Sequence, residues 1–169
     1  MIQGMRKGGM RIGFGYDSHR LAVGRRLVLG GEEIPHEKGL WGHSDADVLI
    51  HAVCDALLGA VGEGDIGRHF PDTDPAYRGI SSLILLERVR EFAVAKGFQV
   101  CNVDSTIVLE KPKLAPHLSA MAENIARVLQ ISPAQVGVKA KTNEGMGLVG
   151  AGESAAAFAV VLVEEGGLS

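Results

Sequence analysis

The sequences GYDSH, residues 15–19, and GHSDADVLIH, residues 42–51, decide how this chain is interpreted. The segment from Arg11 to His19 alternates and carries residues that suit β-structure, so it predicts a strand. Asp17 and His19 then project from the same face of that strand, because side chains repeat every two residues. Ser44 is a favourable N-cap, and the aspartates after it suit a first helical turn, which predicts a helix ending at about Val61.

The strand and the helix each carry candidate metal ligands. One carboxylate and two imidazoles, from Asp17, His19 and His51, suit a catalytic zinc ion, which typically takes three protein ligands and leaves a fourth position open. A lone histidine on an apolar helix face is more often a core residue, but the three residues together favour a metal site. Asp55, four residues after His51, is the candidate carboxylate that would fix the tautomer of its imidazole.

The composition describes one globular domain of 169 residues, with 46% hydrophobic and 22% charged residues. The net charge of −3 and the aromatic content of 5% argue against a nucleic-acid partner. No stretch is apolar enough for a membrane span or a secretory signal, so a cytoplasmic protein with two free cysteine thiols is expected. Residues 1–10 are predicted to be a disordered leader, and residues 11–169 a single catalytic domain.

The remaining elements predict an α+β fold. Strands are expected at residues 27–29, 33–36, 100–109, 135–142 and 154–165. A second helix is expected from Ser81 or Ser82 to about Lys96, and a third from near Pro116 to Gln130. This order suggests one sheet covered by helices on one face.

Two loops also carry polar groups that suit a ligand. Residues 65–74 form either a solvated acidic turn or a site for the hydroxyls of a polyol or for a hard cation. Residues 139–145 leave a strand and enter a glycine turn, which forms either a polar hairpin or a phosphate cradle. In the second case Glu144 would hold a magnesium ion together with phosphate oxygens.

Four segments in the same order resemble the 2-C-methyl-D-erythritol 2,4-cyclodiphosphate synthases. They are GYDSHR at 15–20, GHSDADVLIHAVCDALLGAVGEGDIGRHFPDTDP at 42–75, NVDSTIVLEKPKLAPH at 102–117 and KAKTNEGMG at 139–147. The resemblance implies an enzyme of non-mevalonate isoprenoid biosynthesis. In the reaction that the family catalyses, the 2-phosphate of 4-diphosphocytidyl-2-C-methyl-D-erythritol 2-phosphate attacks the β-phosphorus of the diphosphate, which closes a ring and releases CMP.

The resemblance also implies roles for individual residues. Zinc would be held by Asp17, His19 and His51, and a second divalent ion, magnesium or manganese, by Glu144 with the substrate's phosphates. His43 and Thr142 match transition-state stabilisers, and the family assembles as a homotrimer with active sites between subunits. The implied substrate contacts are Asp17, Ser18, His19, His43, Ser44, Asp65, Ile66, Gly67, Phe70, Pro71, Asp72, Thr73, Asp74, Leu109, Glu110, Lys111, Pro112, Lys113, Leu114, Ala115, Lys141, Thr142, Asn143, Glu144 and Leu148.

Two other classes of function fit the same metal ligands. A phosphohydrolase would use the zinc to activate water, but the matched segments supply no clear general base near the open position. A zinc-stabilised trimerisation or nucleotide-binding module would use the metal only structurally. Structural zinc usually has four protein ligands, whereas three are found here.

Overall fold

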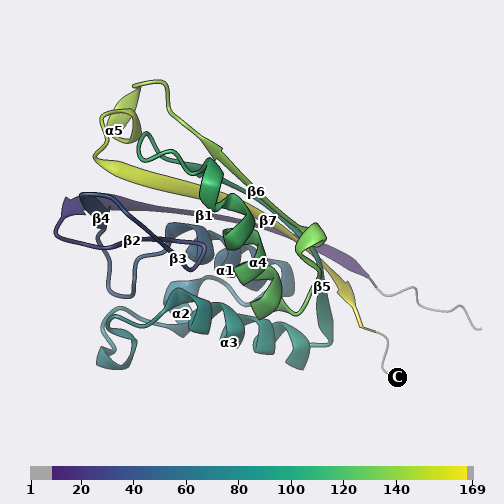
Figure 1. Cartoon of the computed structure of the whole chain (residues 1–169). Helices are drawn as coiled ribbons and strands as arrows, with labels where there is room; N and C mark the ends of the chain where they lie inside the picture. Colours follow the sequence, from purple (N-terminus) through teal and green to yellow (C-terminus); the bar gives the residue numbers. More distant parts are fainter. Residues whose placement is uncertain (1–8, 167–169) are drawn as a thin grey trace, which may run out of the picture.

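A five-stranded sheet with strand order β4-β1-β7-β5-β6 organises the molecule, and a separate β2-β3 hairpin lies beside it (Figure 1). The computed structural model describes residues 9–166. The strands are β1 (Met10–Val23), β2 (Leu27–Leu29), β3 (Glu32–Ile34), β4 (Lys38–Leu40), β5 (Phe98–Val108), β6 (Val136–Lys141) and β7 (Ser154–Glu165). The helices are α1 (Val48–Val61), α2 (Ile66–His69), α3 (Ser82–Ala95), α4 (Leu118–Leu129) and α5 (Gly147–Gly150), with 3-10 turns at Pro75–Tyr77, Ala115–His117 and Pro133–Gln135.

Strands from both ends of the chain form the centre of the sheet. The first strand, β1, pairs antiparallel with the last, β7, and the register places Asp17 opposite Ala157 and His19 opposite Ala155. On its other side β7 pairs antiparallel with β5, which in turn pairs in parallel with β6. The ends of β5 and β6 therefore meet at the same edge of the sheet.

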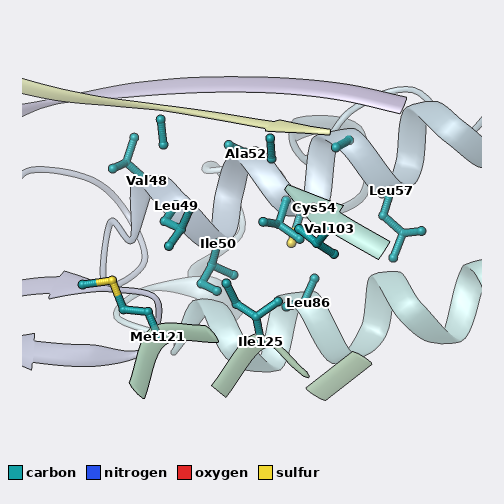
Figure 2. Close-up of a cluster of buried hydrophobic side chains, with 14 of the residues drawn as sticks. Val48, Leu49, Ile50, Ala52, Cys54, Leu57, Leu86, Val103, Met121 and Ile125 are labelled. Atoms are coloured by element: carbon teal, nitrogen blue, oxygen red, sulfur yellow. The ribbon is translucent and has the colours of Figure 1, made fainter. Parts of the chain in front are cut away.

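Helices α1, α3 and α4 cover one face of the sheet, with α1 in contact with β1 and β7 (Figure 1). All but three residues of α1 are buried, and its side chains form the centre of the apolar core with Leu86 of α3, Val103 of β5 and Met121 and Ile125 of α4 (Figure 2). A helix that is apolar on nearly all sides is stable only when it is enclosed in this way. Among residues 9–166, no helix has the length and apolar character needed to cross a membrane.

The opposite face of the sheet carries large apolar side chains that no helix of the described chain covers. Ile12 and Phe14 of β1 are 70% and 64% exposed, and Phe158 of β7 is 38% exposed. Phe158 contacts Phe14 and Tyr16 across the β1-β7 pair, so these rings form one continuous apolar surface, here called the open sheet face. Contiguous apolar surface on this scale usually marks a binding or assembly surface.

The predicted α+β fold with helices on one face is confirmed, and most strand positions agree with the expected ones. Residues 1–8 of the expected leader lie outside the described residues, while Met10 already belongs to β1. The predicted N-cap at Ser44 is wrong, because the helix begins three residues later with Asp47 as its cap. The third helix likewise begins at Leu118, and Pro116 lies in the preceding 3-10 turn. Strand β4 and the short helices α2 and α5 were not expected, since each spans at most four residues.

Asp47 explains why α1 begins where it does. Its Oδ1 accepts from the N–H groups of Ile50 at 3.1 Å and Gly30 at 3.0 Å, and its Oδ2 accepts from Gly31 N–H at 2.7 Å. The side chain is completely buried. One carboxylate therefore caps the helix and also satisfies the amides of the β2-β3 turn, which would otherwise be buried without partners.

Two glycines of β1 let α1 approach the sheet closely. A Cβ atom added to Gly13 would lie 1.8 Å from the carbonyl oxygen of Ala56, and one added to Gly15 would lie 1.9 Å from that of Ala52. Both contacts are with helix backbone, which cannot rotate away as a side chain can. Only glycine at these two positions allows the observed distance between helix and strand.

We predict that Gly15→Ala destabilises the protein by about 3 kcal/mol, because α1 would have to move away from β1 and its packing would be disrupted. The measurement is chemical denaturation followed by circular dichroism. Gly59→Ala is the control, because a Cβ at this exposed position of α1 meets no atom within 4 Å. That variant should be stabilised by roughly 0.5–1 kcal/mol, as expected for alanine in a helix. Equal stability of the two variants would contradict the close-packing argument.

Candidate metal centre and active site

Asp17, His19 and His51 form a compact cluster between β1 and the first turn of α1. The Oδ2 atom of Asp17 lies 2.8 Å from Nε2 of His19 and 2.9 Å from Nδ1 of His51. The two imidazole nitrogens are 3.2 Å apart. These three residues are the only group of metal-ligand type that meets this spacing within residues 9–166, and all are half-buried. The prediction that the three residues meet is confirmed.

The alternation of β1 explains how the cluster forms. Gly13, Gly15, Asp17 and His19 share the face of β1 that points toward α1, as the period of two requires. The glycines let the helix backbone come close, and His51 lies within the first turn of that helix. Ligands separated by more than thirty residues in sequence therefore meet through one strand-helix contact.

Hydrogen bonds on the far side of each ring define which nitrogen faces the cluster. The Nδ1 atom of His19 lies 2.9 Å from the carbonyl oxygen of Trp41, which can only accept a hydrogen bond. His19 therefore carries a proton on Nδ1, and in the neutral ring its Nε2 presents a lone pair to Asp17. The Nε2 atom of His51 lies 2.9 Å from Oγ of Ser82 and 3.1 Å from Oγ of Ser44.

The interpretation of Asp55 as the partner of His51 is wrong. The Oδ1 atom of Asp55 accepts instead from the N–H of Ile66 at 2.7 Å, where it holds the start of α2. Two serine hydroxyls occupy the position beside the His51 ring that the carboxylate was expected to take. Ser82 comes from α3, and its contact with His51 depends on how α3 packs against α1.

The electrostatics of the cluster favour a cation. Burial opposes ionisation of Asp17, but the hydrogen bonds that the His19 and His51 rings donate when they are protonated outweigh it and hold the pKa of Asp17 well below its usual value. Burial likewise disfavours a charged His19, yet the hydrogen bond and negative charge of Asp17 raise the pKa of His19. The carboxylate oxygen of Asp17 and the two imidazole nitrogens beside it thus form a group that attracts either a proton or a metal ion.

The cluster opens into a cleft of about 1140 Å³. His43, Ser44 and residues of the loop that follows α2 also line it. The Nε2 atom of His43 lies 3.1 Å from the carbonyl oxygen of Asp74, to which it donates. The expected site residues that line this cleft are Asp17, His19, His43, Ser44, His51, Ile66, Gly67, Phe70, Pro71, Asp72 and Thr73.

Other expected contacts near the cleft do not line it. Ser18 lies on the opposite face of β1 from Asp17 and His19, as the alternation requires. Asp65 and Asp74 instead cap short helical turns, Asp65 through the N–H of Arg68 and Asp74 through that of Ala76. Their carboxylates are therefore engaged with backbone in this chain.

The remaining expected contacts form a second group beyond the ends of β5 and β6. The N–H of Leu109 donates to the carbonyl of Lys141 at 2.9 Å, and the N–H of Asn143 donates to Oε2 of Glu110 at 3.1 Å. Thr142 Oγ1 donates to Oε1 of Glu144 at 2.7 Å. The structure thus joins residues 109–115 to residues 141–144 through these contacts. Neither these two segments nor Leu148 line the cleft beside the metal cluster.

Several cleft residues had no signal in the sequence. Arg25 lines the cleft, donates to the carbonyls of Leu40 and Gly42, and stacks over the ring of Trp41. Arg78 and Tyr77 also line it. None of these residues belongs to a recognisable spacing, so only the folded chain identifies them. The two arginines bring positive charge to a cleft that also holds the carboxylates of Asp17 and Asp72.

Comparison with known proteins identifies the family of this chain. The model of the YgbB family matches residues 10–164, nearly the whole chain. The chain belongs to the YgbB family. A 2-C-methyl-D-erythritol 2,4-cyclodiphosphate synthase of Pelobacter propionicus is 61% identical over 154 residues, covering 91% of this chain and 98% of the relative. The enzyme of that name from Geobacter sulfurreducens is 59% identical over 156 residues, covering 92% and 99%.

Solved structures of YgbB-family proteins share the fold. A 2C-methyl-D-erythritol-2,4-cyclodiphosphate synthase in a CDP-bound form superposes with a TM-score of 0.84 at 42% identity, covering 90% of this chain and 99% of that one. The IspF–CDP complex of Plasmodium falciparum gives a TM-score of 0.82 at 34% identity, covering 94% and 97%. The bifunctional IspDF of Campylobacter jejuni gives 0.90 at 37% identity, and this chain covers 43% of its length.

We predict opposite pH trends for metal binding and for the stability of the metal-free protein. Because the pKa of His19 is raised above 6.5, its ion pair stabilises the fold fully below that pH and is lost as pH rises through the folded-state pKa. Because the pKa of Asp17 is lowered from 3.8, its contribution is present above that pH and is lost as pH falls. The pair therefore contributes most between these two values, whereas metal binding strengthens above them because protons no longer compete.

The measurements are denaturant unfolding of chelator-treated protein from pH 3 to 9, and zinc affinity by chelator competition over the range in which the protein stays folded. Asp17→Asn is the control, and it should remove the part of the pH dependence of stability that comes from the Asp17–His19 pair. Zinc affinity that is the same at pH 5 and pH 7.5 would contradict the assignment of both imidazoles as ligands.

Proposed function

We propose that this chain converts 4-diphosphocytidyl-2-C-methyl-D-erythritol 2-phosphate to 2-C-methyl-D-erythritol 2,4-cyclodiphosphate and CMP. The observation that carries the proposal is the Asp17–His19–His51 cluster at the base of a cleft, in a chain 61% identical to an enzyme with this name. The activity belongs to non-mevalonate isoprenoid precursor synthesis. A cytoplasmic location suits this biosynthetic role and the two free thiols, Cys54 and Cys101.

Zinc fits the three donor atoms of the cluster. A tetrahedral zinc ion with bonds of about 2.0–2.1 Å separates its ligands by roughly 3.3 Å. The three separations here are 2.8, 2.9 and 3.2 Å, so small side-chain shifts suffice. Bound there, zinc would act as a Lewis acid that polarises a substrate phosphate. Glu144 would hold magnesium or manganese together with phosphate oxygens, which suits an exposed carboxylate beside a glycine turn.

The chain's own residues position the reacting groups. An oxygen of the 2-phosphate forms a bond to the β-phosphorus while the bond from that phosphorus to the bridging oxygen breaks, and CMP leaves with the bridging oxygen. Such a ring closure depends on geometry and charge neutralisation rather than on a protein nucleophile. His43 and Thr142 are assigned to stabilise the transition state, and Ser44 to contact the phosphate. The bond from His43 to the carbonyl of Asp74 fixes the ring at the cleft wall.

The two residue groups suit the two halves of the substrate. Residues 65–67 and 70–74, beside the metal cluster, are assigned to the erythritol moiety, with Asp65 binding its hydroxyls. Residues 109–115, including Lys113, and residues 141–144 are assigned to the cytidine and its phosphates, and Leu148 lies a few residues further along. The hydrogen bonds that join Leu109 to Lys141 and Glu110 to Asn143 support treating these two segments as one nucleotide site.

A homotrimer with active sites between subunits accounts for the separation of the two groups. The nucleotide group of one chain does not line the metal cleft of the same chain. Assembly would bring it to the cleft of a neighbouring subunit. The open sheet face, with Ile12, Phe14 and Phe158 exposed, supplies apolar surface for that contact.

We predict that the purified, zinc-loaded protein with magnesium forms the cyclic diphosphate and equimolar CMP, as followed by phosphorus NMR. Glu144→Gln should reduce turnover at least about 100-fold while leaving the fold intact, because it removes charge from a group that meets the reacting phosphates. Glu123→Gln, an exposed change on α4, is the control and should retain full activity. Linear phosphate products would favour a hydrolase, and zinc binding without turnover would favour a binding module.

We predict that the chain sediments as a trimer, and that Phe14→Asp shifts it toward a monomer because a charge would be buried in the apolar contact. The measurement is analytical ultracentrifugation at several protein concentrations. Val94→Asp is a matched control, since Val94 is exposed on α3, away from the open sheet face. A wild-type monomer at high concentration, or equal masses for the two variants, would contradict this assembly surface.

A further inference from the structure

We propose that Asp45 and Ser82 are positioning residues that set the tautomer of His51, so that its Nδ1 is the metal-binding nitrogen. The inference deepens the proposed function, because it rests on the zinc site assigned to Asp17, His19 and His51. It concerns two residues outside the expected ligand set and substrate contacts.

The first hydrogen bond runs from Ser82 to Asp45. The Oγ atom of Ser82 lies 2.5 Å from Oδ1 of Asp45, and the N–H of Ser82 donates to Oδ2 of the same side chain at 3.0 Å. An ionised carboxylate has no proton to donate, so the hydroxyl of Ser82 must donate to it. Its only proton is then committed, and toward every other neighbour Ser82 Oγ can act only as an acceptor.

The second hydrogen bond follows from the first. Ser82 Oγ lies 2.9 Å from Nε2 of His51. Since this oxygen can only accept, His51 must carry its proton on Nε2. In the neutral imidazole the other nitrogen then has a lone pair. That nitrogen is Nδ1, which faces Asp17 Oδ2 at 2.9 Å and His19 Nε2 at 3.2 Å.

Burial of the two serine hydroxyls keeps the directions of these hydrogen bonds fixed. The side chain of Ser82 is completely buried and that of Ser44 nearly so, which leaves little access for water to reorient the hydroxyls. Ser44 Oγ accepts from the N–H of Ala46 at 3.1 Å and lies 3.4 Å from Ser82 Oγ, to which it can donate its own proton. It also lies 3.1 Å from His51 Nε2, from which it can then accept. The carboxylate–hydroxyl–imidazole chain therefore holds His51 in the form that a metal requires.

The tautomer of His19 is fixed in the same way, but by a backbone carbonyl. There the carbonyl of Trp41 accepts from Nδ1 and exposes Nε2. At His51 the role passes to a side-chain pair from two different segments, the loop before α1 and the start of α3. Removing that pair is therefore possible by mutation, whereas removing the Trp41 carbonyl is not.

Two substitutions test the inference through zinc affinity, measured by chelator competition. Ser82→Ala removes the acceptor but leaves the N–H of residue 82 bonded to Asp45, and Ser44 retains part of the function, so we expect about 10-fold weaker zinc binding. Asp45→Asn leaves one carbonyl oxygen for the donors that the carboxylate now serves, so the hydroxyl of Ser82 is free to donate to His51. We expect a loss of about 10-fold to 100-fold.

Ser81→Ala is the matched control, because the adjacent serine makes no side-chain cap hydrogen bond at the start of α3. Its zinc affinity should stay within about twofold of the wild-type value. Thermal unfolding of each metal-free variant is measured to check that the variant remains folded. If both Ser82→Ala and Asp45→Asn also bind zinc within about twofold of wild type, the inference is overturned.

A measurement on the wild-type protein needs no variant to fold. In zinc-loaded protein labelled with ¹⁵N-histidine, long-range proton–nitrogen NMR identifies the protonated nitrogen of each ring. We expect His51 to carry its proton on Nε2 and His19 on Nδ1. Zinc bound through Nε2 of His51 would overturn the tautomer assignment alone. A wild-type protein that binds no zinc would overturn the zinc site and this inference together.

Discussion

The close contact between α1 and β1 governs both the packing of the core and the geometry of the candidate metal site. Gly13 and Gly15 remove the side chains that would hold the helix away from the strand, and the carbonyls of Ala52 and Ala56 occupy that space. The same face of β1 continues into Asp17 and His19, while the helix presents His51. Packing and metal chemistry therefore share one interface, so a change that loosens the core also separates the ligands.

Two acidic side chains of the loop before α1 hold the first turns of the helices around this interface. Asp47 caps α1 and binds the amides of the β2-β3 turn, whereas Asp45 receives both the N–H and the hydroxyl of Ser82 at the start of α3. A carboxylate that accepts several backbone N–H groups fixes both elements that supply them. The loop before α1 thereby links α1, α3 and the hairpin, and it supplies His43 and Ser44 to the lining of the cleft.

The strand pairings divide the chemistry between two places in the chain. The antiparallel β1-β7 pair carries Asp17 and His19, two of the three candidate metal ligands, while the parallel β5-β6 pair ends in the segments that we propose for the nucleotide. Helices cover one face of the sheet, and the other, the open sheet face, exposes apolar side chains. In the assembly that we propose, neighbouring chains would bring the two groups of residues together and cover the open sheet face.

The α+β class, the main strands and helices, and the candidate ligands Asp17, His19 and His51 follow from local sequence patterns, because alternation and ligand chemistry are local properties. The start of α1 does not lie at Ser44, since the contacts of Asp47 that cap the helix reach Gly30 and Gly31 in a distant turn. The sequence pattern favours Asp55 rather than Ser82 as the partner of His51, because the spacing of two residues on one helix can be read from the sequence and a contact between two helices cannot. The hydroxyls, carbonyls and arginines that surround the candidate ligands could not be predicted, because those contacts exist only once α1, α3 and the sheet have packed together.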